Sequence, residues 1–288
     1  MPFDPRLADF EHERERVKRL AYRMLGSLTE AEDVVQDAWI RWARVDQDVD
    51  VPAAYLTRIV TRLCLDRLKS ARARRETYIG PWLPDPLLTP TDPHDVIADD
   101  VTVTLMLAME RLSPLERAAF LLHDVFDLPL TDVAVTLDRE PAAVRQLASR
   151  ARKNVRTARV RYALEAAEAD RIARAFFNAA RDGDAAALAK VLAEDVEIHS
   201  DGGGKVLALR NIVRGVDHAL RLFAGIRRKD LPGPVLVQTA VIDGLPGYIS
   251  READGSLATT ALELHGGRVR AIYIVRNPDK LAHIADLG

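Results

Sequence analysis

Arginine and lysine residues gather in two blocks of this 288-residue sequence. Residues 139–161 hold eight basic residues and one acidic residue, and residues 54–75 hold seven basic residues and one acidic residue. Guanidinium and ammonium groups at this density bind phosphates, so the blocks predict contact with a polyanion at two places. The alternative is two ordinary solvated helix faces, although such faces rarely exclude acidic residues so thoroughly.

The positive charge is local, because the whole chain carries a net charge of −2. Residues 76–110 contain seven acidic residues and no Lys or Arg, and residues 162–288 are nearly balanced. The length suggests about two domains. There is no apolar run near the roughly 18 residues that a membrane helix needs and no apolar N-terminal signal, so we expect a cytoplasmic protein without a membrane partner.

Metal and thiol chemistry find little support in the composition. The seven His residues are scattered without ligand spacing, so we expect neither a metal nor a cofactor. The single Cys64 lies on an apolar helical stripe, which predicts a buried and unreactive thiol.

The second basic block lies on a predicted helix-turn-helix. The first helix buries Val133, Ala134 and Leu137, the turn is Asp138–Glu140, and Pro141 begins the second helix. Its apolar stripe is Val144, Leu147, Ala151 and Val155. The outward face carries the polar residues, which predicts a helix in the DNA major groove. We expect base-edge contacts from Arg145, Gln146 and Ser149, and phosphate contacts mostly from Arg150, Arg152, Lys153 and Arg156. A helical hairpin with a charged exterior is the structural alternative.

The first basic block follows a helical region predicted over residues 6–44. Thr29 and Glu32 fit a capping box, and the apolar stripe that follows leaves Asp33, Gln36 and Asp37 together as an acidic patch. Pro52 begins a helix to about residue 75, with Ile59, Leu63 and residues 65–68 on its buried side.

Residues 76–97 form a predicted linker. Five prolines between residues 81 and 93 argue against a regular helix or strand and favour an extended chain. The linker nevertheless contains apolar side chains, which are Tyr78, Trp82, Leu83, Leu87 and Leu88. We therefore expect it to dock against a domain.

Residues 98–128 are predicted to be helical, with Ser113, Pro114 and Glu116 forming a second capping box. From residue 162 the pattern changes to two helices and then strands in hairpins, with turns at Gly255, Gly266 and Gly267. This order predicts an α+β domain with a curved antiparallel sheet.

Taken in order, these segments resemble an extracytoplasmic-function (ECF) sigma factor of bacterial RNA polymerase. "AEDVVQDAWIRWAR" resembles the polymerase-binding helix of region two, and "AYLTRIVTRLCLDRLKSARARR" the segment that opens and reads the minus-ten element. The stretch from "LSPLERAAF" to "RARKNVR" resembles region four, which reads the minus-thirty-five element. "YIGPWLPDP", "DGGGK" and "NPDKL" are similar to segments of the sigma-J-like group, which carries a C-terminal SnoaL-like extension.

The resemblance implies two all-α sigma domains, the region-two helical bundle and the region-four helix-turn-helix, followed by an α+β SnoaL-like cone. The expected boundaries are 1–75 for region two, 76–97 for the linker, 98–161 for region four and 162–288 for the cone. Polymerase would supply the catalysis, and this chain would supply promoter choice and strand opening. The extension would pack on the sigma domains and tune their activity.

The resemblance also implies roles for individual residues. Asp33, Gln36 and Asp37 would bind the clamp helices of core RNA polymerase. The residues facing promoter DNA at the minus-ten element would be Arg58, Arg62, Arg67, Lys69 and Arg72. Contacts between the linker and the extension would involve Trp82, Leu83, Pro84, Asp201, Asn277, Pro278, Asp279 and Lys280. Asp138 departs from the glycine that the family often has in this turn, but Asp tolerates a positive φ.

Two other functions remain open from the sequence. A polymerase-independent DNA-binding regulator with a ligand-sensing C-terminal domain explains the helix-turn-helix but not the first basic block. Some SnoaL-like relatives are enzymes with a carboxylate base, for which Asp195, Glu197, His199 and Asp201 are the candidates. The three glycines after Asp201 suit a hairpin or a close backbone contact better than an active site, so we assign no catalytic residue. A small ligand in the cone is also left open.

Overall fold

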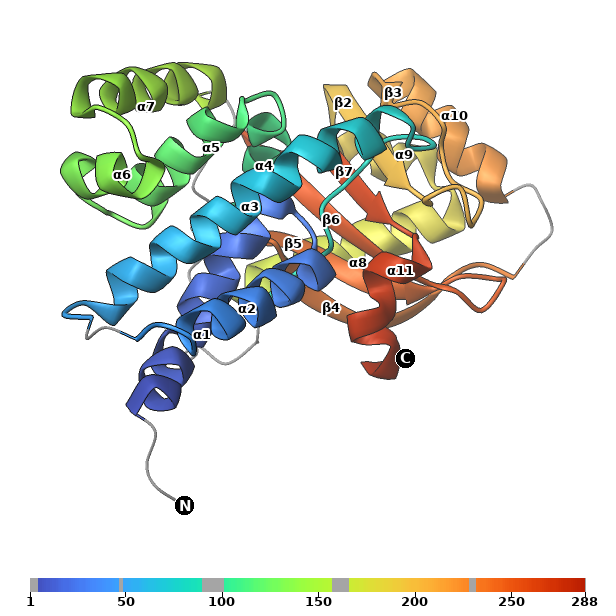
Figure 1. Cartoon of the computed structure of the whole chain (residues 1–288). Coiled ribbons are helices and arrows are strands. Elements are labelled where there is room, and N and C mark those ends of the chain that lie inside the picture. The colour runs from blue at the N-terminus through green and yellow to red at the C-terminus, as the bar shows by residue number, and fades with distance from the viewer. Residues whose placement is uncertain (1–4, 47–48, 90–100, 157–165, 228–231, 288) are drawn as a thin grey trace. The chain divides into compact units, whose positions relative to one another are not determined.

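The computed structural model describes residues 5–46, 49–89, 101–156, 166–227 and 232–287. The chain forms two compact units, one from Met1–Thr77 with Leu105–Arg159 and one from Tyr78–Thr104 with Val160–Gly288. The described linker residues 78–89 therefore belong to the unit that holds the C-terminal domain (Figure 1). Among the described residues, no helix is long and apolar enough to span a membrane.

Three helices begin the first unit: α1 (Pro5–Leu25), α2 (Leu28–Trp42) and α3 (Pro52–Glu76). The predicted capping box at Thr29 is wrong. Gly26 has a φ of 71° and ends α1, and Ser27 caps α2 by accepting a hydrogen bond from the Glu30 amide. Because the cap lies two residues earlier than expected, Thr29 falls inside the first turn.

The remaining helices of this unit are α4 (Val103–Met109), whose first two residues belong to the second unit, α5 (Pro114–Phe120), the π-helical turn η1 (Leu121–Val125), α6 (Leu130–Leu137) and α7 (Pro141–Val155). The predicted capping box of Ser113 and Glu116 is confirmed. The turn between α6 and α7 is also confirmed, because Asp138 adopts the left-handed conformation with a φ of 54°. The predicted apolar stripes of α6 and α7 are buried.

Helix α3 packs against α5 and α6, so the two helical regions lie together in this unit. Arg117 on α5 is 4% exposed and its guanidinium donates to the carbonyls of Met24 at 2.7 Å and Met109 at 2.8 Å. It also pairs with Glu110 at 2.8 Å. Burial lowers the pKa of Arg117 to about 10, so the group is still charged near neutral pH.

The second unit contains the sheet. Its elements are β1 (Leu88–Thr89), α8 (Ala166–Asp182), α9 (Ala185–Val191), β2 (Leu192–Asp201), β3 (Val213–Arg214), α10 (Val216–Arg227), β4 (Val235–Ile242), β5 (Leu245–Arg251), β6 (Leu257–His265), β7 (Arg268–Val275), α11 (Pro278–Leu281) and the 3₁₀ turn η2 (Ala282–Leu287). The strand order is β1-β4-β5-β6-β7-β2-β3. This arrangement confirms the predicted α+β domain, and Gly255, Gly266 and Gly267 occupy its turns with positive φ.

Two details of the sheet differ from the prediction. Strand β2 lies beside β7, the last strand of the chain, and pairs with it in parallel, whereas the other pairs are antiparallel. The linker also supplies strand β1, in which Leu88 is paired with Ile242 of β4. Leu88 and Thr89 lie between prolines and keep their own amide groups, so a short edge strand can form there.

Helices α8, α9 and α10 cover one face of this sheet. Aromatic side chains fill the space between them, with Phe176, Phe177 and Phe223 packing around the buried Tyr248 of β5. Since side chains alternate along a strand, the opposite face carries a second set of residues, and these include Glu197, His199, Glu263 and Tyr273.

Candidate functional site

The acidic patch predicted on α2 is exposed. Asp33 and Asp37 have side chains 54% and 47% exposed, and Gln36 is exposed beside them. Arg67 of α3 reaches both carboxylates, at 3.3 Å from Asp33 and 2.9 Å from Asp37. Partial burial opposes its charge, but the bonds to Asp37 and Asp33 outweigh this and raise the pKa of Arg67. The structure thus joins a residue predicted to face DNA with the patch predicted to bind polymerase.

Three other basic residues of α3 have described side chains, and two of them, Arg62 and Lys69, are exposed. The guanidinium of Arg58 lies 5.4 Å from the centre of the Tyr55 ring. Lys69 pairs with Asp66 at 2.9 Å. The side chain of Arg72 lies outside the described residues, as do the predicted linker residues from 90 to 97. The roles of these residues in DNA binding remain predictions.

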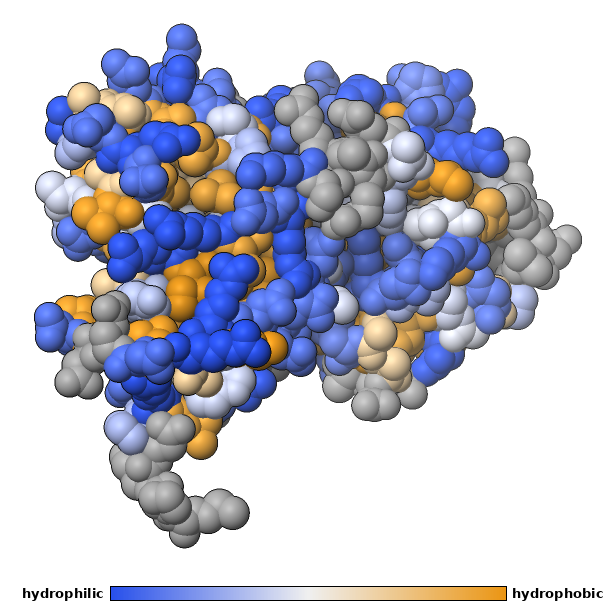
Figure 2. Space-filling view, in the orientation of Figure 1, coloured by the Kyte–Doolittle hydropathy of each residue, from blue (hydrophilic) through white to orange (hydrophobic). Residues whose placement is uncertain are grey.

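The polar face of α7 is exposed along its length. Hydrophilic side chains project from this helix at the upper left of Figure 2. The exposed residues are Arg145, Gln146, Ser149, Arg150, Arg152, Lys153 and Arg156. Arg150 pairs with Glu116 at 3.1 Å and Arg152 with Asp124 at 2.7 Å, so two of the predicted phosphate contacts are oriented by acids outside α7. The predicted helix, turn and helix are therefore present, with a buried stripe and a basic exterior, and the DNA contacts of these residues remain predictions.

A buried ion pair holds the beginning of the linker on the C-terminal domain. Asp201, at the end of β2, is completely buried and lies 2.8 Å from the ammonium group of Lys280. The same carboxylate accepts hydrogen bonds from the Tyr78 hydroxyl at 2.6 Å and from the Leu83 amide at 2.9 Å. Burial and the bond to Asp201 raise the pKa of Tyr78, which keeps its hydroxyl a donor.

Lys280 contacts the linker directly as well. Its ammonium donates to the Leu83 carbonyl and lies 4.4 Å from the centre of the Trp82 ring and 5.2 Å from that of the Tyr78 ring. A cation against two aromatic faces and between two oxygen acceptors is a specific arrangement. Pro84 is buried next to these residues in the sequence.

The "DGGGK" and "NPDKL" segments meet around this pair. Asn277 donates to the Tyr78 hydroxyl at 2.9 Å and caps α11. A Cβ on Gly203 would lie 2.3 Å from the Asn277 amide nitrogen, and its φ of 62° also favours glycine. Pro278 and Asp279 are exposed on α11, and Asp279 pairs with Lys205 at 2.6 Å. Most of the residues predicted for contact with the linker thus lie at one place, and their regulatory role remains a prediction.

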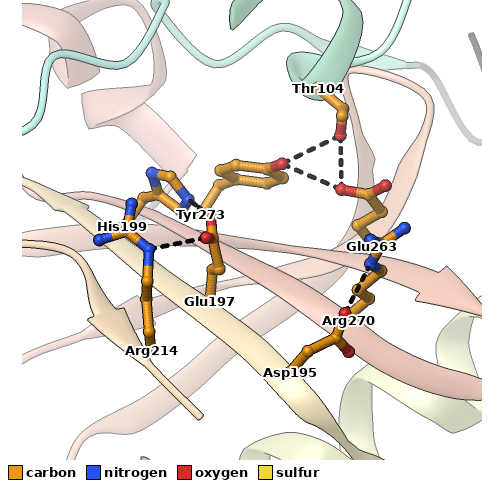
Figure 3. Close-up of polar contacts among 8 residues, drawn as sticks. All are labelled: Thr104, Asp195, Glu197, His199, Arg214, Glu263, Arg270 and Tyr273. Atoms are coloured by element: carbon orange, nitrogen blue, oxygen red, sulfur yellow. Dashed lines mark hydrogen bonds and ion pairs between the residues drawn. The ribbon is translucent and has the colours of Figure 1, made fainter. Parts of the chain in front are cut away.

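Figure 3 shows the side chains on the opposite sheet face, where an enzyme would need a free base. Arg214 lies 2.9 Å from Glu197, and His199 lies 3.1 Å from the same carboxylate. Although partial burial opposes it, the bonds from Arg214 and His199 hold the pKa of Glu197 below its usual value. Asp195 is exposed and pairs with Arg270 at 3.3 Å. These pairings make Glu197 a weak base near neutral pH.

Comparisons with known proteins place these surfaces in a family. Residues 10–74 match the model of sigma-70 region 2, and residues 102–155 match that of sigma-70 region 4. The ECF RNA polymerase sigma factor SigJ of Mycobacterium tuberculosis is 38% identical over 95% of this chain and 92% of its own length. A second protein of that organism, named "Probable ECF RNA polymerase sigma factor SigI", is 33% identical over 99% of this chain and 98% of its own length.

The fold agrees with the sequence comparison. The crystal structure of the M. tuberculosis extracytoplasmic function sigma factor SigJ matches with a TM-score of 0.77 and 34% identity over 96% of this chain and 98% of that chain. Two sigma regions joined by a linker and followed by an α+β domain define a sigma-70-type transcription factor with a C-terminal extension. The chain belongs to the extracytoplasmic-function family of RNA polymerase sigma factors.

Sequence reasoning missed several residues of these sites. The ion pairs of Arg67 and the buried Arg117 were not predicted, because charge alone does not reveal a partner. Glu263 and Tyr273 were also missed. The alternation of Leu262, Glu263 and Leu264 is the ordinary pattern of a strand with one polar face, so nothing in the sequence indicated that Glu263 is buried.

Proposed function

We propose that this sigma factor directs core RNA polymerase to its promoters through three surfaces and regulates itself through a fourth. Asp33, Gln36 and Asp37 bind the polymerase. Helix α3 contacts the minus-ten element and helix α7 the minus-thirty-five element. The C-terminal domain tunes activity by holding the linker between the two DNA-binding regions.

The exposed face of α7 supports the proposed reading of the minus-thirty-five element. Arg145, Gln146 and Ser149 lie on the N-terminal half of the helix, where a helix-turn-helix contacts base edges. The basic residues further along bind phosphates, so binding should weaken strongly as salt increases. Isolated affinity for DNA is low, because two small regions gain avidity only when polymerase fixes their spacing.

The contact of Lys280 and Asp201 with the linker is the observation that carries the regulatory proposal. A linker that served only as a spacer would have no need of a buried ion pair, two aromatic contacts and a strand in the sheet of another domain. The domain acts by binding rather than catalysis, since the bonds from Arg214 and His199 lower the pKa of Glu197 and leave it a weak base. Because a sigma factor acts on RNA polymerase, we expect the protein to act in the cytoplasm.

Transcription in vitro with purified core polymerase tests the proposal. Asp33→Arg combined with Gln36→Arg should abolish co-purification with polymerase, whereas Glu11→Arg, an exposed change on α1, should not. Unimpaired co-purification of the double variant would refute the assignment of the patch. A polymerase-independent regulator would instead bind its operator and give no promoter-specific transcript with core polymerase; family membership does not favour that function.

A further inference from the structure

The far end of the linker also meets the C-terminal domain. In the second unit the linker segment runs from Tyr78 to Thr104, past the predicted end at residue 97 and into the first turn of α4. The Thr104 hydroxyl oxygen lies 2.8 Å from a Glu263 carboxylate oxygen and 3.0 Å from the Tyr273 hydroxyl (Figure 3). Tyr273 donates to the same carboxylate oxygen at 3.0 Å. One residue of the linker and two residues of the sheet thus share a polar cluster.

The register of the sheet creates the place for Thr104. Glu263 on β6 is paired with Ala271 on β7, and Tyr273 is paired with Ala261. The two polar side chains are therefore diagonal neighbours on one face, and the residues directly opposite them are alanines. Small partners leave room above the strands for a side chain from another segment.

Burial makes these hydrogen bonds necessary. Glu263 is 8% exposed and Tyr273 is 5% exposed. Burial and the charge of Glu263 raise the pKa of Tyr273, so its hydroxyl keeps the proton that it donates. A buried carboxylate needs donors, and the Thr104 hydroxyl is one of them. The linker residues just before it, Val101 to Val103, are at most 5% exposed.

We infer that Thr104, Glu263 and Tyr273 form a second anchor, which fastens the end of the linker that leads into region four. The first anchor is the contact of Lys280 and Asp201 with the end that follows region two. The inference rests on the proposed function, because in that function the C-terminal domain limits the distance that the linker can span between the two DNA-binding regions.

Chain length shows why two anchors restrict that reach. The 27 linker residues 78–104 could span at most about 90 Å when extended. The minus-ten and minus-thirty-five elements are about 25 base pairs apart by position, or roughly 85 Å of duplex. A domain of about 156 residues has a radius of gyration of about 15 Å, so anchors on one domain hold both linker ends much closer together. The anchors must therefore open before both elements are bound, and weakening one favours the active state.

Hydrogen exchange on the full chain tests the anchor itself. Thr104→Val and Tyr273→Phe each remove one hydroxyl and keep the shape of the side chain. Tyr248→Phe is the control, because Tyr248 is a buried tyrosine of the same sheet that faces the helices instead. Because a hydrogen bond to a charged group is lost, exchange of the amides at residues 101–106 should become about tenfold faster in the two anchor variants and stay unchanged in the control.

Transcription at limiting sigma factor then tests the consequence. Both anchor variants should give several-fold more promoter-specific transcript than the parent chain, a direction opposite to that of simple damage. Unchanged exchange in Thr104→Val, which lies outside the sheet, would overturn the anchor. Faster exchange without a gain in transcription would show that the anchor does not limit the distance that the linker spans. The exchange result does not depend on sigma activity, so failure of the proposed function would be seen separately.

Discussion

Replacing Lys280 by methionine should release the beginning of the linker. Lys280 and Asp201 have side chains 9% and 0% exposed, and removing one partner of a buried pair costs about 3–5 kcal/mol. A methionine keeps part of the packing on Trp82, so we expect the lower end, about 3 kcal/mol. This cost falls on the bound state of the linker, because the Asp201 carboxylate is left buried without its cation.

The Leu83 amide reports the release directly, since it donates to Asp201 in the bound state. With tenfold in rate for each 1.4 kcal/mol, its hydrogen exchange in Lys280→Met should be roughly a hundredfold faster. Lys205→Met is the matched control. Its ion pair with Asp279 joins side chains 53% and 63% exposed, and such a pair contributes at most about 1 kcal/mol.

Equal exchange at Leu83 in the two lysine variants would refute this reasoning. A second comparison separates charge from shape. Asp201→Asn added to Lys280→Met removes the uncompensated charge and should restore part of the protection. If the double variant exchanges faster than Lys280→Met, the lost protection comes from packing and not from the buried carboxylate.

Three further predictions concern other buried groups. Arg117→Met should destabilise the helical unit by about 3 kcal/mol, because buried carbonyls lose their donor, and faster exchange in α5 would reveal it; the exposed Arg111→Met should have little effect. Burial lowers the pKa of His199, so the unfolded chain takes up a proton first and stability should fall as pH decreases below about 6.5. His199→Gln should flatten that decline in urea midpoints measured against pH; an unchanged slope would contradict it. Burial raises the pKa of the Cys64 thiol, so a disulfide reagent at pH 8 should not react until the protein unfolds, and rapid labelling of the native protein would show the thiol to be accessible.

The helix-turn-helix could be predicted from the sequence because its signals are local. Pro141 fixes the start of α7, Asp138 accepts a left-handed turn, and the spacing of Val144 and Leu147 selects the buried side. Each signal lies within a few residues of the structure that it specifies. Two residues that can cap a helix, Ser27 and Thr29, lie close together before α2, and this explains the error there. Gly26 ends α1 and Ser27 caps α2, so the cap lies two residues before Thr29.

Partners across the chain were decided only by the tertiary structure. The family resemblance implies that Arg67 faces promoter DNA, but the crossing of α2 and α3 places it on Asp33 and Asp37. Likewise, Asp201 could have been an exposed acid in a turn or a catalytic base. In the structure it is buried and accepts a hydrogen bond from Tyr78, which is 123 residues away in the chain.

The sequence by itself therefore determined the elements, the buried stripes and the basic faces, because periodicity and charge are properties of neighbouring residues. The structure decided which strands pair in parallel, where the linker is fastened and how each buried charge is compensated. Those outcomes depend on strand register and helix packing between distant segments. A carboxylate such as Glu263 has the same sequence neighbours whether or not Thr104 reaches it, and only the folded chain brings the two together.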